Sequence, residues 1–141
     1  MKSSVNAESK NPTKVEVNVR DYSFEIDEPE AHGGTGSAPT PVEYELAALT
    51  GCFNVVAHVV ANEMSVEVES LKIQASGELN PAKFQGHDTS ERAGFQQIEL
   101  DIDAETNADL ETEKKLFEKV EERCPVRDNI SHETPVKLKL E

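Results

Sequence analysis

The chain has 141 residues, a formal net charge of -14, few aromatic side chains and no tryptophan. This length suits one domain that buries a core without permanent disulfide cross-links. The excess of acidic residues, 28 against 14 basic ones, argues against nucleic acid or an anionic membrane as a partner.

Residues 1–13 are polar and predict a disordered tail, followed by one domain over residues 14–141. The tail lacks the apolar stretch of a signal peptide, so we expect a cytoplasmic protein. From Val15 onward, apolar residues alternate with polar ones. This pattern predicts two short strands, Val15–Val19 and Tyr22–Ile26, joined in a tight hairpin. A loop rich in glycine and proline is expected from Asp27 to Pro41.

The longest apolar-rich run, Pro41–Met64, predicts a helix that is apolar on all sides and therefore buried. Thr40 and Glu43 have the spacing of a capping box at its start, with Pro41 at the first helical position. Polar interruptions keep the run below the roughly 18 consecutive apolar residues typical of a membrane span.

Beyond this helix, the apolar residues change from even-numbered to odd-numbered positions at Ser70, which predicts a long strand with a bulge or a bend. A broad loop, Gly77–Gly94, separates it from a strand around Ile98–Ile102. An amphipathic helix is expected from about Asn107 to Pro125, with Leu110, Phe117, Val120 and Cys124 on its apolar face. Alternation over Val136–Leu140 predicts a final strand. The fold class is α+β, with antiparallel-leaning sheets packed on a long central buried helix and a second amphipathic helix.

The sequence contains two cysteines, Cys52 and Cys124. Cys52 lies mid-helix among apolar neighbours, which raise a thiol pKa, so a reactive Cys52 needs a cation from elsewhere. Cys124 ends the apolar face of the second helix and points at the same core. The pair could form a disulfide if the Cα atoms lie within roughly 7 Å. Spacing alone slightly favours two unrelated core thiols. No histidine has zinc-ligand spacing to either cysteine.

Two segments resemble the OsmC/Ohr family of osmotically induced and organic hydroperoxide resistance proteins. Pro41–Glu43 followed by Leu46–Cys52 is similar to the family's first cysteine segment, and Cys124-Pro125-Val126 to its second. The order of the elements also matches, and the resemblance covers nearly everything from Val15 onward.

The resemblance implies an OsmC-like fold, an intertwined homodimer and a peroxidase without a cofactor. Its substrates would be organic hydroperoxides, with hydrogen peroxide as a further candidate. Cys52 would be the peroxidatic thiolate, Cys124 would resolve its sulfenic acid as a disulfide, and an external dithiol would reset the pair. Glu43 would orient an arginine against the thiolate. Arg20 is our choice for that arginine, and Arg92 is the substitute.

Helix geometry constrains this arrangement. Glu43 and Cys52 are nine residues apart, which places them roughly 13 Å apart along the axis and on opposite faces. Glu43 therefore reaches Cys52 only from a partner subunit or through an intervening arginine, which predicts composite sites at a two-fold interface. A helix-capping carboxylate is an equally good interpretation of Glu43. The alternative function is an OsmC-like binding protein for a small apolar ligand, with structural or redox-sensing cysteines.

Overall fold

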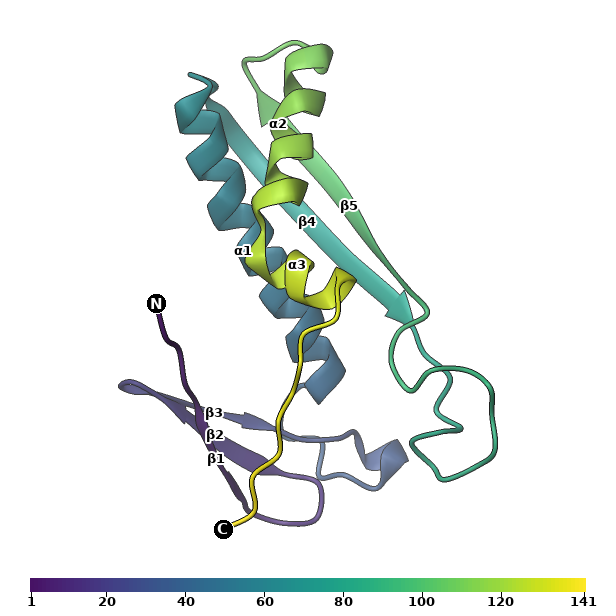
Figure 1. Cartoon of the computed structure of the whole chain (residues 1–141). Coiled ribbons are helices and arrows are strands. Elements are labelled where there is room, and N and C mark those ends of the chain that lie inside the picture. The colour runs from purple at the N-terminus through teal and green to yellow at the C-terminus, as the bar shows by residue number, and fades with distance from the viewer. The chain divides into compact units, whose positions relative to one another are not determined.

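The computed structural model describes all 141 residues, and their contacts form two compact units, Met1–Leu46 and Ala47–Glu141 (Figure 1). The boundary falls inside the long helix α1, Pro41–Glu63. The sequence led us to expect a tail over residues 1–13 and one domain over 14–141. The expectation of one domain stays a prediction. The boundary between the two compact units lies within a helix that was expected at this place.

The first unit contains an antiparallel sheet in the order β1 (Asn6–Ser9), β2 (Val15–Val19), β3 (Tyr22–Ile26). The hairpin of β2 and β3 has the expected bounds, and Arg20 in its turn has a φ of 50°. β1 lies within the segment expected to be disordered. Its four residues are all exposed, so it carries no hydrophobic alternation, and pairing with the edge of β2 is what orders it.

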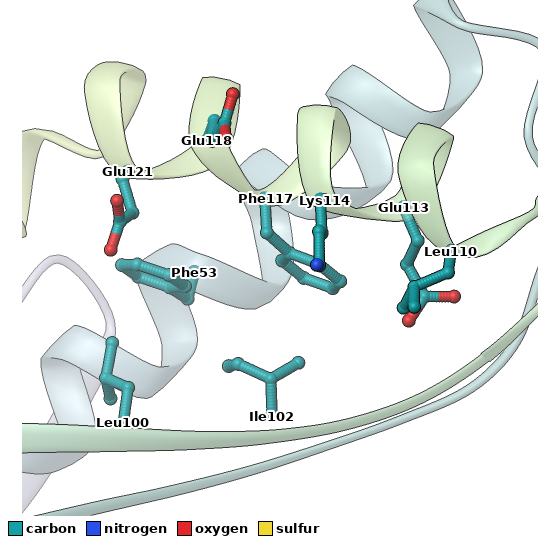
Figure 2. Close-up of a pocket in the computed structure, with 9 residues that line it drawn as sticks. All are labelled: Phe53, Leu100, Ile102, Leu110, Glu113, Lys114, Phe117, Glu118 and Glu121. Carbon is teal, nitrogen blue, oxygen red and sulfur yellow. The ribbon is translucent and has the colours of Figure 1, made fainter.

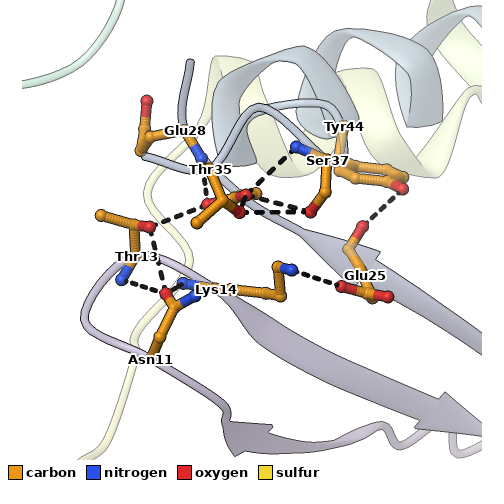
Figure 3. Close-up of polar contacts among 9 residues, drawn as sticks. Asn11, Thr13, Lys14, Glu25, Glu28, Thr35, Ser37 and Tyr44 are labelled. Carbon is orange, nitrogen blue, oxygen red and sulfur yellow. Dashed lines mark hydrogen bonds and ion pairs between the residues drawn. The ribbon is translucent and has the colours of Figure 1, made fainter. Parts of the chain in front are cut away.

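A loop connects β3 to α1 and contains the short 3-10 helix η1, Glu30–His32. The Tyr44 hydroxyl, in the first turns of α1, donates a 2.8 Å hydrogen bond to the Glu25 carbonyl oxygen (Figure 3). The Tyr44 ring also packs against Phe24, with 5.2 Å between the ring centroids. These contacts hold the beginning of α1 on β3.

The second unit contains an antiparallel pair, β4 (Val68–Glu78) and β5 (Gln97–Thr106). The register shifts between Val68 and Ser70, which confirms the predicted irregularity of the strand at this place. After β5 come α2, Leu110–Arg123, and α3, Pro125–Ser131. Pro125 therefore ends one helix and occupies the first turn of the next. Helix α3 was not predicted from the sequence.

Helices α1 and α2 lie along the β4–β5 pair (Figure 1). The buried core cluster consists of Leu49, Phe53, Ala57, Val60, Ala61, Leu116, Val120 and Cys124. One face of the strand pair packs against it through Leu71, Ile73, Ile98, Leu100 and Ile102. Burial of a large aliphatic side chain contributes about 1.5–3 kcal/mol, so this cluster is the main source of stability in the second unit.

The apolar composition of α1 predicted a helix that is buried on all sides. The structure contradicts this prediction. Val55 is 61% exposed and Val59 is 44% exposed, whereas Phe53 and Val60 are buried. The helix is long and apolar enough to cross a membrane, a property that core helices of soluble proteins share. In the single chain, one apolar side of α1 therefore has no protein neighbour.

The predicted final strand is wrong for the single chain. Residues 133–141 form no strand, and the side chains of Val136, Leu138 and Leu140 are 93%, 86% and 89% exposed. A strand requires a neighbour that accepts its backbone hydrogen bonds. Nothing in this chain pairs with the segment, although β5 has one neighbour, β4, and thus a free edge.

Candidate active site

The two thiols converge in the second unit. The sulfur atoms of Cys52 and Cys124 lie 2.8 Å apart, and both cysteines are free. A disulfide bond measures about 2.05 Å, so the thiols are in direct contact without a covalent bond. Cys124 is fully buried and Cys52 partly buried. Of the two interpretations that spacing left open, the structure contradicts unrelated core thiols.

The local sequence of α2 and of the proline that follows it determines where Cys124 lies. Asp109 caps the start of α2 by accepting a hydrogen bond from the backbone N–H of Thr112. Leu116 and Val120 are buried at the four-residue spacing that continues to Cys124. Leu110, which we expected on this apolar face, is 69% exposed. Cys124 itself has an extended backbone, because the residue before a proline avoids helical angles.

Burial raises the pKa of the Cys52 thiol, and contact with Cys124 adds to this effect. The backbone N–H of Val126 acts in the opposite direction, but more weakly than burial. No cation is among the groups that shift this pKa. The surroundings of Cys52 in the single chain therefore favour the thiol over the nucleophilic thiolate.

Glu43 forms the predicted capping box in the first unit. Its carboxylate accepts a 2.9 Å hydrogen bond from the Thr40 backbone N–H, and the Thr40 hydroxyl accepts one of 3.2 Å from the Glu43 N–H. The bonds from Thr40 hold the pKa of Glu43 below its ordinary value. No arginine pairs with Glu43 in the single chain, so capping is the role that these contacts give it.

The two candidate arginines make contacts of their own. The Arg20 guanidinium lies over the Tyr22 ring, 5.1 Å from its centroid. Arg92, in the loop between β4 and β5, donates a 3.3 Å hydrogen bond to the Phe95 carbonyl oxygen. Neither has an ion pair with a carboxylate. Arg20 and Glu43 belong to the first unit, and Arg92 belongs to the second unit with the thiols.

The family model described as OsmC-like protein matches residues 34–139. The chain belongs to the OsmC-like family. An OsmC-like protein from Mycoplasma pneumoniae has a similar structure, with a TM-score of 0.81 and 17% sequence identity, over 93% of this chain and 88% of that chain. No curated protein matches the sequence.

Two further solved structures have names that mention organic hydroperoxide resistance. The protein from Legionella pneumophila matches with a TM-score of 0.65 and 22% identity, over 92% of this chain and 89% of its own. The protein from Elizabethkingia anophelis matches with a TM-score of 0.67 and 18% identity, over 91% of this chain and 86% of that chain. These likenesses show the OsmC-like fold.

The second unit of this OsmC-like chain also contains a groove beside the core, which we call the α2–β5 groove (Figure 2). It has a volume of about 320 Å³. Its lining residues come from α1, β5 and α2 and are Phe53, Leu100, Ile102, Leu110, Glu113, Lys114, Phe117, Glu118 and Glu121. The floor is apolar, and three of the four charged lining residues are acidic. No local sequence pattern indicates the groove, because its walls come from segments far apart in the chain.

Sequence reasoning also missed Asp27, a fully buried carboxylate in the first unit. It accepts hydrogen bonds from the hydroxyls of Thr13, Thr35 and Ser37 and from two backbone N–H groups (Figure 3). The bond from Thr35 is the main cause that holds the pKa of Asp27 far below its ordinary value. Asp27 therefore fastens the loop before α1 to the β1–β2 turn.

We expect Asp27→Asn to destabilise the protein, because the amide cannot accept all of these bonds. An aspartate with a lowered pKa stabilises the fold fully above its unfolded pKa of about 4 and loses this effect as the pH falls. The urea midpoint of the variant should thus lie below that of the native protein at pH 7, and the difference should shrink at pH 2.5. Glu30→Gln, in the same loop, is the control. An equal difference in urea midpoint between the variant and the native protein at both pH values would contradict this account.

Proposed function

We propose that this OsmC-like protein is a thiol-dependent peroxidase that reduces organic hydroperoxides. The 2.8 Å approach of the Cys52 and Cys124 sulfur atoms supports it most directly. Cys52 attacks the O–O bond, which breaks to give a Cys52 sulfenic acid and an alcohol. Cys124 then attacks the Cys52 sulfur, which forms a disulfide and releases water. An external dithiol reduces the disulfide and completes the cycle. The names of the Legionella and Elizabethkingia relatives support the substrate class.

The reactive form of Cys52 requires a positive charge that its own surroundings lack. Burial is the largest influence on its pKa and raises it. We infer that a second copy of the chain supplies the charge, through Arg20 with Glu43 as its partner and Arg92 as the substitute. The active site is then composite. In this arrangement the guanidinium stabilises the thiolate that burial disfavours.

The second copy also provides a neighbour for the C-terminal segment, which we define as residues 135–141. One side of this segment carries Val136, Leu138 and Leu140, and the other side carries Lys137 and Lys139. β5 has the complementary pattern: apolar residues face the core, whereas its outward residues are Glu99, Asp101, Asp103 and Glu105. We infer that the segment pairs with the free edge of β5 in the second copy. Its apolar side chains then fill the α2–β5 groove, and its lysines face the acidic side of β5.

A thiol titration tests the proposed reaction. Adding tert-butyl hydroperoxide to the reduced protein should consume two thiols per chain for each peroxide, because the reaction ends in an intramolecular disulfide. Excess dithiothreitol should then support continuous peroxide consumption. Hydrogen peroxide is the comparison substrate. Intact thiols after addition of stoichiometric organic hydroperoxide would show that the chain is not this peroxidase.

The second candidate is a binding protein for a small apolar ligand, and the raised pKa of Cys52 favours it. The thiol pKa of the assembled protein separates the two functions. A Cys52 that titrates above the ordinary value of about 8.5, together with no peroxide turnover, supports binding. A pKa well below that value, which rises in Arg20→Gln or in Arg92→Gln, supports the peroxidase. The absorbance of the thiolate, compared with that of Cys52→Ser, measures this pKa.

A further inference from the structure

An ion pair joins the end of α2 to the end of α1. Arg123 is the last residue of α2 and immediately precedes Cys124, and Glu63 is the last residue of α1. The Arg123 guanidinium makes two parallel contacts with the Glu63 carboxylate, Nη1 to Oε2 at 2.6 Å and Nη2 to Oε1 at 3.0 Å. Apart from the thiols, these are the only side-chain hydrogen bonds between the two helices.

The geometry separates this contact from an ordinary surface ion pair. Most exposed pairs contribute little, but a two-pronged arginine–carboxylate contact fixes direction as well as distance. The side chains of Arg123 and Glu63 are 42% and 51% exposed, compared with 64% and 83% for the single contact of Lys115 with Glu111. The contact lowers the pKa of Glu63 and raises that of Arg123, so both groups stay charged around neutral pH.

Core packing holds Cys124, which is fully buried, but few polar contacts restrain its sulfur. The chain leaves α2 at this residue in an extended conformation. Apart from Cys52, the Cys124 sulfur has one polar contact, a long one of 3.5 Å from the Arg127 N–H, and the Cys124 carbonyl oxygen accepts a 3.0 Å hydrogen bond from the Asp128 N–H. Leu116 and Val120 fix α2 against the core by packing. This packing restrains the distance between α2 and the core better than it restrains sliding of α2 along its own axis. The pair of Arg123 with Glu63 restrains this sliding motion.

We propose that Glu63 and Arg123 are positioning residues for disulfide formation, because their contact holds the Cys124 sulfur against the Cys52 sulfur. The inference rests on the proposed function for its biological meaning. In the step concerned, the Cys124 sulfur bonds to the Cys52 sulfur as the S–O bond of the sulfenic acid breaks. The oxygen leaves as water with the Cys124 proton, and the hydroperoxide is the oxidant that supplied that oxygen.

Glu63→Gln removes the charge with little change in size. We expect disulfide formation after a single addition of tert-butyl hydroperoxide to slow by about three- to tenfold, the range of a well-oriented partly exposed pair. The rate of the first step, in which the Cys52 thiol is lost, should change less than twofold. Trapping of the sulfenic acid by dimedone should increase accordingly. The double variant Glu63→Arg with Arg123→Glu should recover most of the native rate, and Glu111→Gln on α2 should behave as the native protein.

A second measurement is independent of peroxidase activity. Equilibration of the reduced protein with mixtures of oxidised and reduced glutathione gives the effective concentration of Cys124 at Cys52. This concentration should fall about three- to tenfold in Glu63→Gln and recover in the double variant. Equal values for Glu63→Gln and the native protein would overturn the inference. If tert-butyl hydroperoxide leaves Cys52 intact but the glutathione equilibrium shifts as expected, the proposed function fails and the positioning role stands.

Discussion

Cys52→Ser should reduce dithiol-dependent consumption of organic hydroperoxide to the rate of the reaction without protein. The serine hydroxyl is not ionised near neutral pH and cannot attack the O–O bond, whereas a thiolate can. The substitution changes the side-chain volume little at this partly buried position. Loss of activity with an unchanged thermal midpoint would therefore identify the reacting atom. Retention of native turnover by Cys52→Ser would end the assignment.

Cys124→Ser is the matched variant, because it removes the neighbouring sulfur and leaves Cys52 in place. The first addition of hydroperoxide should still consume the Cys52 thiol, but the product should remain a sulfenic acid. Excess hydroperoxide should then convert it to the sulfinic acid, which a dithiol does not reduce. Mass spectrometry of the intact chain distinguishes these products. Sustained turnover with dithiothreitol at the native rate would show that Cys124 does not resolve the intermediate.

Leu138→Glu should convert the dimer that we propose into monomers. A leucine buried in the α2–β5 groove contributes about 1.5–3 kcal/mol, and a carboxylate there meets the acidic residues of the groove rim. A two-fold dimer contains this change twice, so the dissociation constant should rise by at least about a hundredfold. Sedimentation at micromolar concentration measures the effect.

Phe84→Glu is the control for this experiment. Phe84 is 83% exposed, similar to Leu138, and lies in the loop between β4 and β5. The substitution adds the same charge but removes no proposed contact, so the dimer should persist. If the active site is composite, Leu138→Glu should also raise the pKa of Cys52 and abolish turnover. A native chain that sediments as a monomer would remove both the dimer and the composite site.

The sequence by itself determined the elements that depend on neighbouring residues. Thr40, Pro41 and Glu43 marked the start of α1, because a capping box is made by residues three apart. Alternation located the hairpin of β2 and β3, and the change from even-numbered to odd-numbered apolar positions located the irregularity in β4. The motifs around Cys52 and Cys124 also pointed to the OsmC-like family, which the family model shows.

Only the tertiary structure decided what depends on residues far apart in the chain. The contact of Cys52 with Cys124 spans 72 residues, and no local pattern encodes such a distance. β1 has no pattern of its own and is ordered by the edge of β2. Conversely, alternation over Val136–Leu140 predicted a final strand, and this prediction was wrong for the single chain, because the segment pairs with no strand there. Local preference thus sets which conformations are available, and the presence of a packing neighbour decides which are adopted.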